Sequence, residues 1–210
     1  MRVNKFARLF VSLTLSLIFS LILATAPGSA FGRASADPAP VPQFNESESG
    51  SILREIKVFA LARISARRAI AIAERRGAGA KVVDLSFDGS TPHPAYGVKV
   101  LLKGELWEGT IDASTGVPVG IGSTTPVSRL GEENRATLAA FSAAGIDLSE
   151  TIAIAEQHGS GKAVSAGLQH DGAKLILLVV VVSEGSLKEV AVEPTEKRSL
   201  QRKASARERK

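Results

Sequence analysis

The sequence contains no cysteine and few aromatic residues. Among 210 residues there are one tryptophan, one tyrosine and no cysteine, so disulfides, thiolate metal sites and cysteine nucleophiles are excluded. Histidine is also scarce, because only His93, His158 and His170 are present. Metal sites usually combine several histidine and carboxylate ligands, and these three histidines are scattered along the chain. We interpret them as solvent-exposed side chains, although His158 and His170 could approach each other, and we predict no metal and no other cofactor.

No arrangement of catalytic residues is visible either. No serine lies in a Gly-x-Ser-x-Gly turn. Glu74 and Glu156 each end a separate predicted helix, whereas an acid and a base carboxylate must flank one bond, so we interpret both as surface charges. Gly77-x-Gly79 and Gly159-x-Gly161 follow helices, which is typical of helix termination and not of phosphate binding. The sequence therefore predicts no catalytic, cofactor-binding or metal-ligating residue, and we expect that the protein is not an enzyme.

The excess of basic residues is confined to the two ends of the chain. The formal net charge is +5, but acidic residues outnumber basic ones between Asp37 and Glu196. Nucleic-acid binding requires a basic face on the folded domain, so we expect no nucleic-acid partner. The segment from Lys197 to Lys210 is predicted to be a basic disordered tail. As an alternative, this tail associates weakly with anionic membrane lipid or cell-wall polymer.

The first 36 residues resemble a signal peptide. Basic residues precede an apolar stretch from Leu9 to about Ala26, and small residues follow it. We predict a signal peptide over 1–36 that is cleaved after Ala36 or, as second choice, after Ala30. An uncleaved membrane anchor is the alternative, but serine and threonine dilute the apolar stretch. The protein is therefore expected to be periplasmic or secreted.

One short sequence occurs twice. The run Ile70-Ala71-Ile72-Ala73-Glu74 recurs unchanged as Ile152-Ala153-Ile154-Ala155-Glu156, and Asp88-Gly89 recurs as Asp171-Gly172. An internal repeat of this kind predicts one supersecondary unit that is built twice.

Each unit is predicted to be one helix followed by three short strands. In the first unit, Ser65 is a suitable N-cap for a helix over 66–76. Alternating apolar residues then indicate three strands, and we expect Phe87 and Tyr96 to fill the core rather than to join Trp107 in an aromatic recognition patch. In the second unit Ser149 is the expected N-cap, and the helix and strands are predicted at 150–158, 163–169, 174–182 and 187–192.

The predicted fold is therefore α+β, with two repeats that are each a helix and a three-stranded antiparallel meander. A helix from about Glu132 to Ala144 connects them. The predicted organisation is a signal peptide at 1–36, a disordered linker at 37–50, the first repeat with a preceding short helix at 51–120, a connector at 121–145, the second repeat at 146–196 and the tail at 197–210.

One strand of the second repeat is apolar at every position from Leu175 to Val182. Unbroken apolarity indicates that both faces of the strand are covered. The helix at 150–158 can cover one face, and the first repeat, the connector helix or another chain must cover the other. We expect most of the strand to be buried within a monomer, since an open apolar face would promote aggregation or partner binding.

The first repeat resembles the PepSY domain. The matching residues are Ile64-Ser65, Ala69-Ile70 and Ile72-Ala73-Glu74 in the helix, and Ile111-Asp112-Ala113-Ser114-Thr115-Gly116 in the closing turn. The second repeat is similar in its helix and strands, but Val192-Glu193-Pro194-Thr195-Glu196 lacks the closing glycine. No peptidase domain accompanies the repeats. The resemblance implies a stand-alone tandem PepSY protein that binds or inhibits proteases without catalysis.

Two functional hypotheses follow. The first is an exported binding module of two PepSY-like units that engages an unidentified protein, a peptidase of the cell envelope being the partner that the resemblance suggests. The alternative is a structural or surface-associated envelope protein that docks on polyanions through its basic C-terminal tail.

The predicted leader can be tested by mass. We expect the mature protein from its native host to begin near Asp37, which intact-mass measurement would show. A membrane-bound form that retains residues 1–30 would instead identify the segment as an anchor.

Overall fold

The computed structural model describes residues 46–171 and 174–193. The predicted signal peptide, most of the predicted linker and the basic tail lie outside these residues. The chain divides into two compact units, Met1–Ser51 and Ile52–Lys210, and the description below concerns the second unit. Its described elements, with the start of α2 included, are α2 (Glu46–Ala60), α3 (Ala66–Glu74), β1 (Lys81–Asp88), β2 (Ala95–Leu102), β3 (Glu105–Asp112), β4 (Pro118–Pro126), the 3₁₀ turn η1 (Val127–Arg129), α4 (Glu132–Ala144), α5 (Leu148–Gly159), β5 (Lys162–Asp171), β6 (Lys174–Ser183) and β7 (Ser186–Val192).

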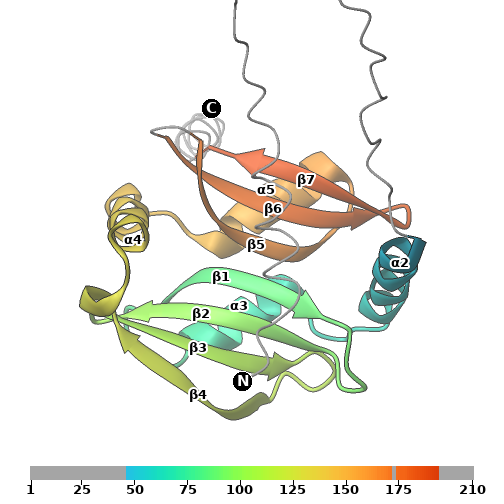
Figure 1. Ribbon diagram of the computed structural model, residues 1–210, viewed down its shortest axis with the longest axis horizontal. Coiled ribbons are helices and arrows are strands. Elements are labelled where there is room, and N and C mark those ends of the chain that lie inside the picture. The colour runs from blue at the N-terminus through green and yellow to red at the C-terminus, as the bar shows by residue number, and fades with distance from the viewer. Residues whose placement is uncertain (1–45, 172–173, 194–210) are drawn as a thin grey trace, which may run out of the picture. The chain divides into compact units, whose positions relative to one another are not determined.

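The fold is α+β and is built on one antiparallel sheet. Its seven strands lie in the order β4-β3-β2-β1-β5-β6-β7 (Figure 1). The first strand group, β1 to β4, joins the second strand group, β5 to β7, where β1 pairs with β5, with Leu85 opposite Ala166. The sequence predicted a three-stranded meander in each repeat but did not predict that the two would join into one sheet. The strand groups meet edge to edge, because β1 and β5 satisfy each other's backbone hydrogen-bonding groups.

Strand β4 was not predicted. In the organisation predicted from the sequence, residues 118–120 end the first repeat and residues 121–126 belong to the connector. The structure places β4 at the edge of the sheet, where proline is tolerated. Gly120 and Gly122 have φ values of 71° and 74°, and the pairing register with β3 shifts between Glu108 and Thr110. The strand is therefore irregular, which explains why no alternating pattern marks it in the sequence.

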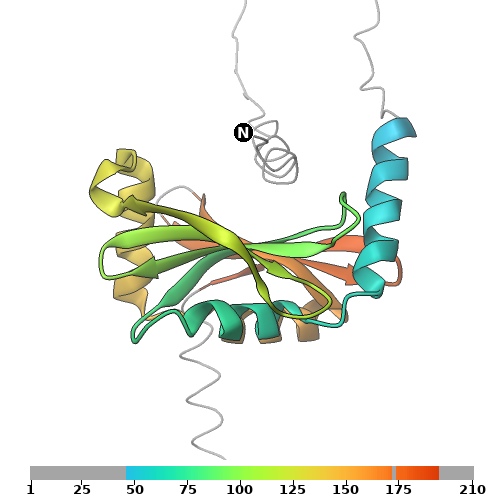
Figure 2. The ribbon, with the colours of Figure 1, turned by 90° about the horizontal axis from the view of Figure 1, so that it is seen from below.

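Helices α3 and α5 pack side by side on one face of the sheet (Figure 2). Ile70 and Ile152, from the repeated sequence, are fully buried there. Ser65 caps α3 as predicted, since its side chain accepts a hydrogen bond from the Arg68 amide at 3.2 Å. The cap of α5 is Asp147 rather than Ser149, because the Asp147 carboxylate accepts hydrogen bonds from the first free amides of the helix. Helix α4 spans Glu132–Ala144, as the sequence predicted.

Helix α2 begins earlier than predicted, at Glu46, so the last residues of the predicted linker are helical. Near its other end Phe59 is buried and makes an edge-to-face contact with Phe87, with ring centroids 5.0 Å apart. This aromatic contact holds the end of α2 against β1.

The apolar strand β6 is largely buried within one chain. Leu177, Val179 and Val181 are covered on the helical side of the sheet, and Val180 on the opposite side is 2% exposed. Leu178 and Val182 are half-buried. Neither face of the strand lies wholly open, which agrees with the expectation that most of it is buried.

Glu74 and Glu156 are not the simple surface charges that the sequence indicated, because each makes a hydrogen bond to the backbone. The Glu74 carboxylate accepts a hydrogen bond from the amide of Val82 at 3.2 Å. The Glu156 carboxylate accepts one from the amide of Ala163 at 3.0 Å. Each glutamate therefore links the end of its helix to the first residues of the following strand.

No single helix of the described residues is long and apolar enough to cross a membrane. Helices α4 and α5 meet that criterion only together, as a pair bent by 85°.

The carboxylate of Glu156 can be tested by a pair of substitutions. Glu156→Ala leaves the buried Ala163 amide without its acceptor and is expected to lower the free energy of unfolding by about 1–2 kcal/mol. Glu156→Gln keeps a carbonyl acceptor and should lose less than half of that amount. Urea unfolding of the two variants measures the difference. Equal losses would contradict a hydrogen-bonding role for the side chain.

Candidate functional site: a basic groove beside α4

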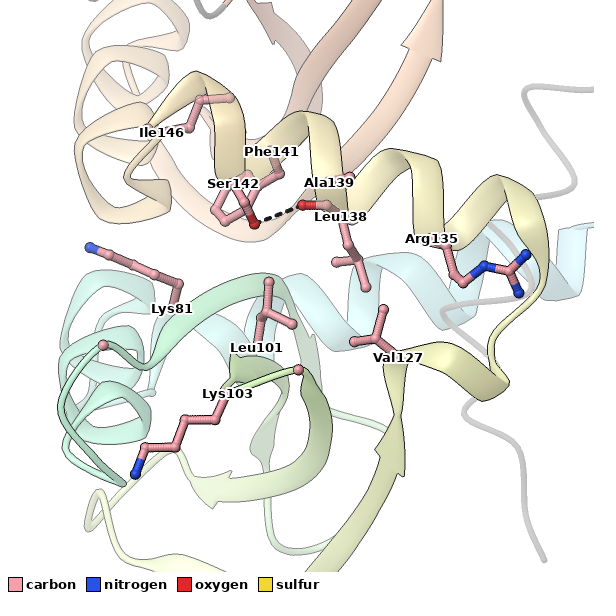
Figure 3. Close-up of a pocket in the computed structure, with 13 residues that line it drawn as sticks. Lys81, Leu101, Lys103, Val127, Arg135, Leu138, Ala139, Phe141, Ser142 and Ile146 are labelled. Atoms are coloured by element: carbon pink, nitrogen blue, oxygen red, sulfur yellow. Dashed lines mark hydrogen bonds between the residues drawn. The ribbon is translucent and has the colours of Figure 1, made fainter.

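A groove of about 500 Å³ lies between α4 and the end of the first strand group (Figure 3). One wall is formed by Gly79, which precedes β1, and by Lys81, the first residue of β1. The β2–β3 hairpin adds Leu101, Lys103 and Gly104 to this wall. The other wall comes from α4 and the residues that follow it. The thirteen lining residues are Gly79, Lys81, Leu101, Lys103, Gly104, Val127, Arg135, Leu138, Ala139, Phe141, Ser142, Gly145 and Ile146.

The floor of the groove is apolar. Leu101, Val127 and Leu138 point toward one another across it (Figure 3). Leu138, Phe141 and Ile146 are buried, whereas Leu101 and Val127 are half-buried. The groove therefore offers a partly accessible apolar surface that is continuous with the core.

Every charged residue in the lining is a cation. Lys81 and Lys103 lie to one side of the apolar floor and Arg135 lies to the other (Figure 3). Arg135 donates a hydrogen bond from Nη1 to the Leu130 carbonyl at 2.6 Å, which holds its guanidinium group near the residues that precede α4. No aspartate or glutamate lines the groove, so no acidic side chain of the lining neutralises its positive charge.

Lys81 is partly neutralised by Asp147, the N-cap of α5, with Nζ and Oδ2 3.3 Å apart. Burial opposes ionisation of Asp147, but hydrogen bonds from the Glu150 amide and from Lys81 keep the pKa of its carboxyl below the ordinary value. The ion pair thus fastens the start of α5 to β1 beside the groove.

The hairpin that carries Lys103 is tightly defined. Lys103 and Gly104 have φ values of 51° and 79°, the left-handed pair of a two-residue turn. Glu184 and Gly185 form the same turn between β6 and β7, with φ values of 52° and 75°. A charged residue of either sign therefore fits the first position of this turn.

A second candidate surface is the sheet face opposite α3 and α5. Val180 lies there and is the buried apolar side chain that does not join the continuous core. Asp84, Lys99 and Glu108 lie in register on neighbouring strands of the same face. Burial raises the pKa of Asp84, with Lys99 opposing the shift and Glu108 adding to it. The row is therefore polar, with charges of both signs.

The three histidines do not belong to a metal-binding cluster among the described residues. His93, His158 and His170 are exposed, and the structure shows His170 beside Thr137, with Nε2 and Oγ1 3.0 Å apart. Within residues 46–171 and 174–193, no group of three or more histidine, aspartate or glutamate side chains could hold a metal ion.

The aromatic residues occupy the core side of the sheet. Phe87 and Tyr96 are buried, as expected, and the Tyr96 hydroxyl donates to the Ile64 carbonyl at 2.8 Å. Trp107 is also mostly buried, with the Arg76 guanidinium 3.6 Å above its ring. The three residues therefore do not form an exposed recognition patch.

The second glycine motif has a packing role that the sequence did not predict. Helix α5 ends at Gly159, and Ser160 takes the left-handed cap position with a φ of 51°. A β-carbon at Gly159 would lie 2.4 Å from Val181, and one at Gly161 would lie 2.3 Å from the Val182 carbonyl oxygen. Glycine is needed here because the helix end approaches β6 closely.

Residues 63–121 match the family model described as the peptidase propeptide and YPEB domain, PepSY. These residues form a PepSY domain. The domain covers α3, β1, β2, β3 and the beginning of β4, and its bounds agree with the resemblance seen in the first repeat. PepSY domains are generally non-catalytic modules of the propeptide type. The groove lies between this domain and α4, which follows it in the sequence.

No curated protein matches the chain. Among solved structures, the crystal structure of a protein from Clostridium difficile 630, provisionally described as a lipoprotein, is similar with a TM-score of 0.38 and 17% sequence identity. The alignment covers 63% of this chain and 88% of that chain.

One buried carboxylate oxygen among the described residues, Oε2 of Glu55 in α2, has no hydrogen-bond partner. Burial, with a smaller contribution from Asp88, raises the pKa of Glu55 from 4.5 to about 7. The protonated form is therefore favoured by folding. Its contribution to stability is complete below pH 4.5 and is lost as the pH rises through about 7.

Replacing this carboxyl by an amide should remove that part of the pH dependence. We expect Glu55→Gln to raise the melting temperature by about 1–3 °C at pH 8 and to change it much less at pH 5. The effect is small because Glu55 is only half-buried and solvent screens its charge. Thermal unfolding of both proteins at the two pH values measures it. An equal rise in melting temperature at pH 5 and pH 8 would contradict the conclusion that ionisation of Glu55 causes the effect.

Proposed function

We propose that this chain is an exported, non-catalytic binding module of two PepSY-type units, and that its partner is a peptidase of the cell envelope whose activity it modulates. The PepSY domain at residues 63–121 supports the peptidase connection, because the family is described as a peptidase propeptide domain. The signal-peptide pattern of residues 1–36 supports export.

The second PepSY-type unit is proposed for residues 146–196. Equivalent details recur in both strand groups. Glu74 and Glu156 make the same helix-to-strand hydrogen bond. The register is irregular at the same place, between Val82 and Asp84 in β1 and between Ala163 and Ser165 in β5. These local matches extend the sequence repeat beyond its helix, so they favour a duplicated unit over a chance recurrence of five residues.

The groove beside α4 is the observation that carries the binding function. A partly accessible apolar floor with only cations around it has the character of a recognition site. Its chemistry suits binding and not catalysis. Ser142, the hydroxyl in the lining, donates to the Leu138 carbonyl at 2.8 Å, and the lining contains no histidine, aspartate or glutamate that could act as its base.

The alternative of polyanion docking depends on the tail at 197–210, which lies outside the described residues. Docking through the tail therefore stays a prediction of the sequence.

A pair of α4 substitutions tests the proposed function. Ala139 lines the groove, whereas Ala136, one turn earlier and also exposed, does not. A tryptophan at 139 should fill the groove, while a tryptophan at 136 adds the same bulk outside it. Partners are captured with the unmodified chain from the envelope fraction of the native host, purified, and assayed for peptidase activity and for binding to each variant.

We expect a captured peptidase to change its activity when the chain is added, and Ala139→Trp to weaken its binding at least tenfold, about 1.4 kcal/mol. Ala136→Trp should bind within about twofold of the unmodified chain. A captured partner that binds both variants equally would overturn the groove as the binding site. A partner without peptidase activity would overturn the peptidase assignment.

A further inference from the structure

We infer that the groove beside α4 recognises an extended, acidic peptide segment, in which a few apolar side chains occupy the floor and carboxylates lie beyond its ends. This inference rests on the proposed function, because it names the chemistry of the ligand for the same site.

The size of the groove favours an extended chain. Its volume of about 500 Å³ lies in the range of small-ligand sites. In an extended segment every second side chain faces the same way, so a short stretch presents only a few side chains to a groove of this volume. A few apolar side chains of an extended segment fit, with Leu101, Val127 and Leu138 beneath them.

The charges select the sign of the ligand. Lys103 makes no ion pair with any described acid, and the polar contact of Arg135 is with a backbone carbonyl and not with a carboxylate. Only Lys81 is paired, with Asp147. Individually, exposed ion pairs contribute little, but cations on both sides of an apolar floor attract an acidic ligand and repel a basic one.

The arrangement of the cations also sets the pattern of the ligand. Lys81 and Lys103 lie on one side of the floor and Arg135 on the other (Figure 3). The side chains of Lys103 and Arg135 extend in different directions from the floor (Figure 3), so they favour more than one acidic group on the ligand. A segment with acidic residues before and after its apolar centre meets both. The chain's own tail at 197–210 is basic and is therefore the wrong sign for this groove.

Three synthetic peptides provide the test. They share one apolar centre of three residues and carry glutamate, glutamine or lysine at the two positions on either side. Isothermal titration calorimetry with the full chain at low salt measures their affinities. We expect the glutamate peptide to bind about tenfold or more tightly than the glutamine peptide and the lysine peptide to bind more weakly than both. Added salt should reduce the difference.

Reversing the protein charges distinguishes recognition from damage to the fold. Lys103→Glu should fold normally, since Glu184 occupies the same left-handed turn position in the β6–β7 hairpin. In a variant with Lys103→Glu and Arg135→Glu, the order of the peptides should invert, so that the lysine peptide binds best. Lys162→Glu makes a charge reversal at an exposed lysine outside the groove and should leave the order unchanged.

Equal binding of the three peptides, or no inversion in the double variant, would overturn the inference. So would tighter binding of a fatty acid, such as decanoate, than of the glutamate peptide. These failures are separate from failure of the proposed function. If a captured peptidase is sensitive to Ala139→Trp but no peptide binds, the proposed function stands and the acidic-peptide ligand is wrong. If the peptides bind as expected but binding of the captured peptidase is unaffected by Ala139→Trp, the acidic-peptide ligand stands and the groove is not the peptidase-binding site.

Discussion

The pairing of β1 with β5 is the constraint on which the rest of the structure depends. It converts two strand groups into one sheet, with Leu85 and Ala166 opposite each other at the join. It also places α3 and α5 against each other on one face, where Arg67 Nε donates to Ser149 Oγ at 3.4 Å. The two helices and both strand groups therefore share a continuous core, which neither group could form alone with the same buried area.

The groove follows from that topology. The chain leaves the first strand group at β4, on the outer edge, but the next strand, β5, lies in the middle of the sheet. The connection through η1 and α4 must therefore return across the ends of the strands. Its apolar residues Leu138 and Phe141 reach the core, while the start of α4 stays further out. The space that remains beside α4 has an apolar floor because it borders the core, and basic walls because of three residues from distant parts of the sequence.

Features set by neighbouring residues could be predicted from the sequence, and features set by distant ones could not. The Ser65 cap, the bounds of α4, the alternation in β1, β2 and β3, and the Lys103-Gly104 turn all depend on local preferences. The hydrogen bonds of Glu74 and Glu156 were missed because a glutamate at a helix end has no local signature of the strand amide it will meet. The groove was missed for the same reason, since Lys81, Lys103 and Arg135 show no common pattern along the chain.

The irregularity of β4 has a consequence for the behaviour of the protein at high concentration. The opposite edge strand, β7, carries Lys188 and Glu189, charges that discourage pairing with another chain. Strand β4 has no charged residue, and Val119 and Ile121 on it are 53% and 93% exposed. Its left-handed Gly120 and Gly122 interrupt the even spacing of backbone donors and acceptors, and prolines stand at both of its ends. A second β4 therefore cannot align with it over a full strand length, so backbone geometry protects this edge from sheet-to-sheet aggregation where charge does not.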